Sequence, residues 1–179
     1  MSVKTENQIW ADLRKLITLG LAKFGIEGWQ IRQLQQPVKI TTLQPTVFMA
    51  KLNAPRIGWQ YSKNEVVDGR LMRTEKFIQE IRFQISALKK RIPAVVDDFT
   101  SSDALNALIS WFMSRDGLSA IRALGYNTYR VGRLEEPFFI DDSDTYERNP
   151  YFEFSLIVNQ SYSEEIPGTN QLIPKITGV

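Results

Sequence analysis

The stretch that decides the fold is residues 56–88, RIGWQYSKNEVVDGRLMRTEKFIQEIRFQISAL. Apolar side chains alternate with polar or small ones from Ile57 to Tyr61, and the same alternation returns from Ile81 to Ala87. A period of two is typical of a β-strand. Between the two runs lies Asp68-Gly69, a dipeptide that favours a tight reversal of the chain. The stretch therefore predicts one long β-hairpin over about residues 56–91, with a polar tip that projects beyond the core.

Helices and shorter strands are predicted on both sides of this hairpin. Apolar residues recur every three or four positions from Thr5 to Phe24, and the cap residues at 100–103 introduce a second helix that Gly117 is expected to end. A third, short helix is predicted from Leu118 to Leu124, and Gly125 ends it. Strands are predicted at Trp29–Leu34, Thr46–Leu52, Tyr126–Leu134 and Tyr151–Tyr162. This order predicts an α+β fold, a mainly antiparallel sheet flanked by helices with a long projecting β-hairpin.

The chain reads as one domain followed by a tail. Residues 1–165 are expected to form a single α+β domain that includes the hairpin at about 56–91, and residues 166–179 an extended C-terminal arm. From Ser163 onward, proline and glycine disfavour a regular element, although the arm is more apolar than a disordered tail needs to be. The arm either lies along a neighbouring subunit by strand addition or packs back on its own domain and frays.

Charge is segregated along the sequence. Residues 70–91 hold seven cations and two anions, and residues 135–165 hold nine anions and one cation. Opposite charges on two surfaces set orientation and partner choice, so the pattern favours a head-to-tail contact of the kind that closes rings. Alternatively, the two segments meet inside one subunit or are simply solvated. The predicted interface residues are Arg70, Arg73, Lys76 and Arg82 on the basic side, and Glu135, Glu136, Asp141, Asp142, Asp144 and Glu147 on the acidic side.

Composition disfavours most enzyme classes. The sequence contains no cysteine and no histidine, which removes thiol nucleophiles, Cys-bound zinc and the commonest general base and metal ligand. One cluster could serve a carboxylate-dependent metal enzyme, namely Asp141, Asp142, Asp144 and Glu147, but it lacks the glycine of an EF-hand loop and is expected to be a solvated acidic loop. No catalytic residue, cofactor or metal site is therefore predicted.

Other features point to a protein that is made and used in a cytoplasm. A net charge of +2 without interleaved aromatics disfavours DNA binding as the main activity, and the sequence shows neither a secretory signal nor a membrane span.

The four tryptophans, Trp10, Trp29, Trp59 and Trp111, are expected in the core. Phe138 and Phe139 are expected to be pinned into the core from an acidic loop, or else to form part of a contact surface.

A family resemblance is carried by residues 101–158, SSDALNALISWFMSRDGLSAIRALGYNTYRVGRLEEPFFIDDSDTYERNPYFEFSLIV, with FIQEIRFQISAL at residues 77–88 in the place of a central strand. This stretch resembles the neck and tail-terminator proteins of long-tailed bacteriophages. The resemblance implies a virion protein, assembled in the cytoplasm of the bacterial host, that forms a ring, usually of six subunits, capping the tail tube. It implies the tail tube protein, neck or connector proteins and the sheath as partners, DNA only in passage through the lumen, no membrane and no catalytic residues. A neck adaptor or head-completion protein is the alternative.

Overall fold

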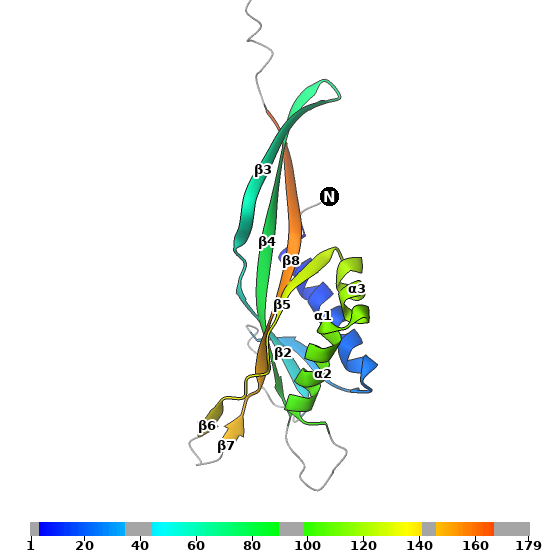
Figure 1. Cartoon of the computed structure of the whole chain (residues 1–179), viewed down its shortest axis with the longest axis vertical. Coiled ribbons are helices and arrows are strands. Elements are labelled where there is room, and N and C mark those ends of the chain that lie inside the picture. The colour runs from blue at the N-terminus through cyan, green and yellow to red at the C-terminus, as the bar shows by residue number, and fades with distance from the viewer. Residues whose placement is uncertain (1–3, 35–43, 90–98, 141–145, 167–179) are drawn as a thin grey trace, which may run out of the picture.

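One long strand runs through the whole fold. The structure is a computed structural model that describes residues 4–34, 44–89, 99–140 and 146–166. Within these ranges β4 (Arg70–Leu88) has 19 residues and is paired along both edges. β8 (Tyr151–Glu165) runs antiparallel along one edge, from the pair Ser86↔Tyr151 to the pair Met72↔Glu165. β4 and β8 therefore span the molecule from its core to a distant tip (Figure 1).

The other edge of β4 is covered by two strands that follow each other in the chain. β2 (Thr46–Asn53) pairs with residues 82–88 of β4, and β3 (Arg56–Val67) pairs with residues 70–79. The two strands are separated by Ala54 and Pro55, and proline has no backbone N–H to donate to a ladder. Hydrogen bonding nevertheless continues across the break, because the Pro55 carbonyl accepts from the Glu80 N–H at 3.0 Å.

The remaining strands complete a mainly antiparallel sheet. β1 (Gln30–Gln33) lies parallel to β2, and β5 (Tyr126–Val131) lies antiparallel to β8. A separate two-stranded sheet consists of β6 (Phe138–Ile140) and β7 (Tyr146–Arg148), where the sequence had suggested only a loop. β8 also continues through residues 163–165, which were not expected to form a regular element. The predicted fold class, α+β with a mainly antiparallel sheet, is confirmed.

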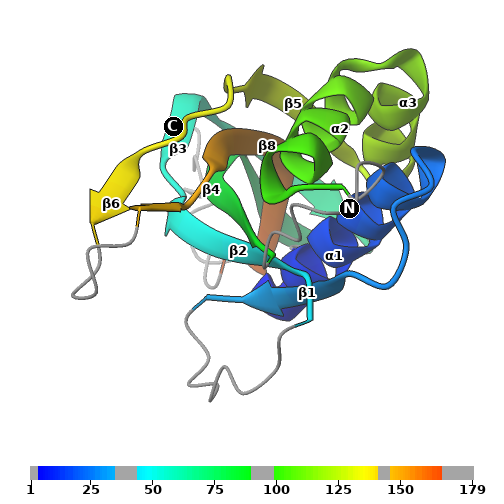
Figure 2. The same ribbon diagram turned by 90° about the horizontal axis from the view of Figure 1, so that it is seen from below.

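Three helices cover one face of the lower part of this sheet (Figures 1 and 2). They are α1 (Glu6–Lys23), α2 (Ser101–Met113) and α3 (Arg115–Ala123). α1 and α2 each begin with a capping box, in which Thr5 pairs with Gln8 and Thr100 with Asp103. No helix in the described part of the chain is long and apolar enough to cross a membrane.

Aromatic side chains join the helices to the sheet. The Trp10 ring of α1 meets Phe83 of β4 edge-on, with centroids 5.4 Å apart, and the Phe112 ring of α2 stacks on Phe154 of β8 at 4.2 Å. The side chains of Phe83, Phe112 and Phe154 are at most 1% exposed. Full burial of one such side chain contributes about 1.5–3 kcal/mol. The core therefore lies between the helices and the lower half of the sheet.

The junction between α2 and α3 corrects one prediction. Gly117 does not end α2; it lies inside α3, and the break falls at Ser114. Ser114 ends α2 and also caps α3, because its hydroxyl donates to the Trp111 carbonyl at 2.7 Å and accepts from the Gly117 N–H at 3.1 Å. Gly117 is needed for a different reason. A Cβ at this position would lie 2.0 Å from the Trp111 carbonyl oxygen.

Candidate subunit interface

The upper part of the sheet extends beyond the helices (Figure 1). This extension consists of β3, residues 70–79 of β4 and residues 159–165 of β8. Among the described strands β3 pairs only with β4, and β5 pairs with β8 only as far as Val158. The extension therefore presents two strand edges that, within the described part of one chain, have no strand beside them. Exposed edges of this kind favour pairing with another chain unless something covers them.

A two-residue turn closes the tip of the extension. β3 ends at Val67 and β4 begins at Arg70, so Asp68 and Gly69 form the turn, at the dipeptide that the sequence predicted. Both residues have positive φ, 50° and 76°. Positive φ at both central positions is the requirement of the type I′ turn that suits twisted hairpins. The turn fixes the register of β3 on β4 at the tip.

One tryptophan lies on the surface of the extension. Trp10 and Trp111 are buried as predicted, but Trp59 is 98% exposed, so the prediction that it belongs to the core is wrong. The reason is its position. Trp59 lies where the β3–β4 register is irregular, between Ile57 and Tyr61, and these two residues pair with Ile78 and Lys76, on the face of β4 opposite to the core residues Ile81 and Phe83. An exposed tryptophan is an energetically costly surface group and a common centre of protein contacts.

Trp59 belongs to the lining of a groove of about 390 Å³. The groove is lined by Trp59 and Tyr61 from β3, Lys76, Phe77 and Ile78 from β4, and Asn159, Gln160 and Ser161 from β8. Lys76 pairs in register with both Tyr61 and Ser161, and its ammonium lies 5.9 Å from the centre of the Tyr61 ring. The volume is within the range of about 300–1,000 Å³ typical of ligand pockets. The groove thus combines apolar walls with one cationic group.

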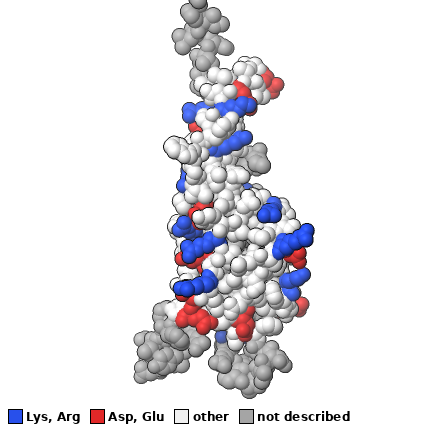
Figure 3. Space-filling view, in the orientation of Figure 1, with Lys and Arg blue, Asp and Glu red and all other residues white. Residues whose placement is uncertain are grey.

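The basic character of the hairpin is neutralised in the folded extension. Arg70 forms an ion pair with Glu165 at 3.3 Å, and Arg73 forms one with Glu75 at 2.9 Å. Figure 3 shows blue and red side chains mixed over the extension. For Glu165 the structure therefore shows the alternative of contact within one subunit, and Glu164 lies opposite Arg73 in the strand register. Five cations meet five anions in residues 56–79 and 157–166, namely Arg56, Lys63, Arg70, Arg73 and Lys76 against Glu65, Asp68, Glu75, Glu164 and Glu165.

Lys76 differs from the two arginines. Within the described residues its ammonium forms no ion pair, and its contact is the Tyr61 ring. It lines the groove beside Ile78. Lys76 is therefore the cation of the predicted basic set whose charge remains available to a partner.

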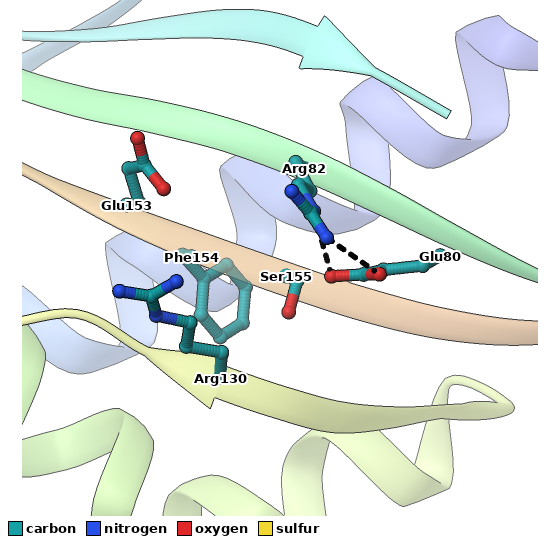
Figure 4. A pocket seen from close by; sticks show the side chains of 6 residues that line it. All are labelled: Glu80, Arg82, Arg130, Glu153, Phe154 and Ser155. Atoms are coloured by element: carbon teal, nitrogen blue, oxygen red, sulfur yellow. Dashed lines mark hydrogen bonds and ion pairs between the residues drawn. The ribbon is translucent and has the colours of Figure 1, made fainter. Parts of the chain in front are cut away.

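Arg82 lies lower, on the face of the sheet away from the helices (Figure 4). Its guanidinium donates two hydrogen bonds to Glu80, from Nε to Oε1 at 2.9 Å and from a terminal nitrogen to Oε2 at 3.2 Å. These bonds, together with Ser155 and the charge of Arg130, hold the pKa of Glu80 below its usual value although the side chain is buried. The cavity beside them measures about 10 Å³, room for about one water. This site is a structural ion pair, and Arg82 is already engaged.

The acidic segment lies at the other end of the molecule. Glu135 accepts a hydrogen bond from Arg133 at 2.9 Å, and its backbone pairs with Tyr151 at the lower end of β8. Glu136 follows it, and Glu147 lies in β7, opposite Phe139. Asp141, Asp142 and Asp144 lie outside the described residues. Ten residues of β8 separate Tyr151 from Ser161 in the groove, about 33 Å at about 3.3 Å per residue. Within the described residues, the structure does not bring Arg70, Arg73 or Lys76 to Glu135, Glu136 or Glu147; the contacts between charged side chains of the two segments include the ion pair of Arg70 with Glu165 and the cavity that Arg82 shares with Glu153.

Within the described ranges, no three carboxylate, imidazole or thiol groups are gathered in a way that could hold a metal ion. The cluster proposed from the sequence falls largely outside these ranges. The described residues therefore offer two candidate surfaces for contact with another protein chain, namely the extension and the acidic segment.

Comparisons with known proteins identify a family and a similar fold. The family profile described as "E217 gateway protein gp29" matches residues 8–168. Among solved structures, the fold is similar to a chain described as "Cryo-EM Structure of an Extracellular Contractile Injection System, PVC sheath/tube terminator in extended state", with a TM-score of 0.52 and 14% sequence identity. The match covers 94% of the present chain and 60% of that chain, so the present chain spans less than two thirds of its length. At this identity the similarity shows a shared fold. No curated protein matches the sequence.

Proposed function

The chain belongs to the E217 gateway protein gp29 family, one of the neck and tail-terminator proteins of long-tailed phages, and from this premise we propose that it forms a ring that caps the tail tube at the head–tail junction. The family match over residues 8–168 carries the proposal. Its role is structural, and we propose no catalytic activity. The similarity of the fold to a sheath/tube terminator chain supports the terminator assignment.

The proposed ring contact joins the two ends of neighbouring copies. Arg70, Arg73 and Lys76 of one copy face the acidic residues 135–147 of the next, whereas Arg82 is held by Glu80 of its own chain. The separation of about 26–33 Å between groove and acidic segment supports this arrangement, because such a distance allows contact between copies but not within one. A contact between unlike patches is heterologous and closes a ring when the rotation between copies allows it.

The further details of the assembly are also proposals. The ring has six subunits and meets the tail tube protein, neck or connector proteins and the sheath. DNA passes through its lumen without specific recognition. Residues 1–165 act as one domain, and residues 166–179 as an extended C-terminal arm.

Light scattering across protein concentrations tests self-association, and electron microscopy of the same samples tests the ring. Reversing three charges, Arg70→Glu, Arg73→Glu and Lys76→Glu, should abolish the ring and leave a folded subunit. The fold should persist because the exposed intrachain pairs of Arg70 and Arg73 are worth only about 0–1 kcal/mol. Rings that form unchanged in the triple variant would contradict the proposed pairing.

A position on the head side of the junction is the second candidate function, and the gateway description of the family favours it. Co-sedimentation distinguishes the two candidate functions. A terminator should bind the ends of purified tail tubes, whereas a gateway or neck adaptor should bind head connectors and leave bare tubes unbound.

A further inference from the structure

Resting on the proposed ring, we propose that the groove beside Trp59 binds the acidic, aromatic segment at residues 135–140 of a neighbouring copy. The apolar part of the segment fills the groove, and its carboxylates approach Lys76. This contact, rather than the paired arginines nearer the tip, supplies most of the energy that holds two copies together.

The composition of the groove determines what can bind it. Trp59, Tyr61 and Ile78 offer apolar surface, at 98%, 53% and 39% exposure. Lys76 adds a positive charge without an ion pair in the described part of its own chain. A well-matched ligand therefore carries apolar or aromatic side chains next to a carboxylate. Buried aromatic anchors surrounded by a polar rim are the usual centre of a protein interface.

Residues 135–140 have this composition, as they read Glu-Glu-Pro-Phe-Phe-Ile. β6, which contains the last three of them, belongs to a two-stranded sheet apart from the main sheet (Figure 1). A sheet of two strands is marginally stable by itself in water and needs to pack against something. The groove of a second copy supplies apolar surface and a complementary charge.

The same chain cannot provide this contact. Glu135 pairs with Tyr151, at the end of β8 opposite to the extension, and the groove lies about 26–33 Å further along the strand, at Asn159 to Ser161. The contact must therefore be made between copies, which is also what a heterologous ring requires.

Residues 167–179 are the rival occupant, because they follow directly from the tip of the extension. They read PGTNQLIPKITGV, with one lysine and no aspartate or glutamate side chain. A segment without a side-chain carboxylate offers Lys76 no acidic side chain. Charge therefore favours residues 135–140.

The first test is the substitution Trp59→Ala, with Tyr129→Ala as the matched control. Tyr129 is also a highly exposed aromatic residue of the sheet, at 71% exposure, but it does not line the groove. Self-association measured by light scattering should weaken at least about tenfold in the Trp59 variant, because central aromatic anchors dominate interface energies. It should change less than about twofold in the control. Equal effects of the two substitutions would overturn the inference, and circular dichroism verifies that both variants are folded.

A covalent test uses the natural absence of cysteine, which leaves no background. Asn159→Cys lies in the groove and Pro137→Cys in the acidic segment, and the two single variants are mixed and oxidised. A disulfide requires Cα atoms within about 7 Å, so a bond between these positions can form only between copies in contact. The control pairs Asn159→Cys with Ser119→Cys, an exposed site on α3. We expect a linked dimer from the first mixture and none from the control.

The outcomes separate this inference from the proposed function. Rings that form without linkage between positions 159 and 137 overturn the inference and leave the ring intact. If deletion of residues 167–179 abolishes association while Pro137→Cys remains unlinked, the C-terminal segment occupies the groove and the inference is wrong. A protein that remains a single subunit both in solution and on tail tubes overturns both.

Discussion

Substitution of Gly117 by alanine should destabilise the subunit by about 2–4 kcal/mol. The added Cβ would lie 2.0 Å from the Trp111 carbonyl oxygen, whereas ordinary contacts begin at 3.4 Å, so α2 and α3 would have to separate by about 1.4 Å. The oxygen belongs to backbone, which cannot swing aside as a side chain can. Separation breaks the two hydrogen bonds of the Ser114 hydroxyl, each worth about 0.5–1.5 kcal/mol, and overpacking adds about 1–3 kcal/mol. The better helix propensity of alanine returns at most about 1 kcal/mol.

Urea unfolding followed by far-UV circular dichroism measures this loss directly. Ser119→Ala is the matched control, because Ser119 lies in the same helix and is exposed, so its effect should remain within about 0.5 kcal/mol. A Gly117→Ala protein whose unfolding midpoint and m-value match those of the natural chain would refute the reasoning. It would mean that the two helices can separate without cost.

Two further predictions concern the sheet. Hydrogen bonds from Arg82 lower the pKa of buried Glu80. The pair therefore stabilises the fold fully at pH values above about 4.3, the ordinary pKa of a glutamate side chain. This stabilisation is lost as the pH falls through the lowered pKa of Glu80. Urea unfolding at a series of pH values should show this loss below about pH 4.3, and Glu80→Gln should reduce it; an identical acid dependence in the variant would contradict the assignment. Gly69→Ala should destabilise the tip by about 1–2 kcal/mol because its φ is +76°, and amide hydrogen exchange should quicken in β3 more than in β1; unchanged exchange in β3 would show that the turn tolerates a side chain.

The sequence predicted the elements whose signals are local. Alternation and spacing predicted all three helices and the strands of the main sheet, and Asp68-Gly69 predicted the turn, because these signals depend on neighbours in the chain. The family resemblance is confirmed by the match over residues 8–168. The predicted interface residues remain a prediction.

Features that depend on the third dimension were missed. Trp59 continues an apolar alternation and was expected in the core, but it lines a groove with Lys76 and Ile78, on the face of β4 opposite to the core, and alternation alone does not say which face the helices cover. The charge excess at residues 70–91 is real in the sequence, yet β8 brings Glu164 and Glu165 against it. Gly117 was expected to end a helix. Its role is to leave room for the Trp111 carbonyl, and this close approach of α2 to α3 cannot be read from residue spacing.

The uninterrupted pairing of β4 with β8 has a mechanical consequence. Their register runs from Ser86↔Tyr151 to Met72↔Glu165 without a shift, so the extension cannot bend at its base within the plane of the sheet without breaking ladder hydrogen bonds. It should move as a stiff lever. Arg70 lies about 36 Å along β4 from Ile81, at about 3.3 Å per residue, so tilting the subunit body by about 5° would swing the tip by about 3 Å. A small change in how one subunit leans would thereby be magnified into a shift large enough to remake contacts at a distance.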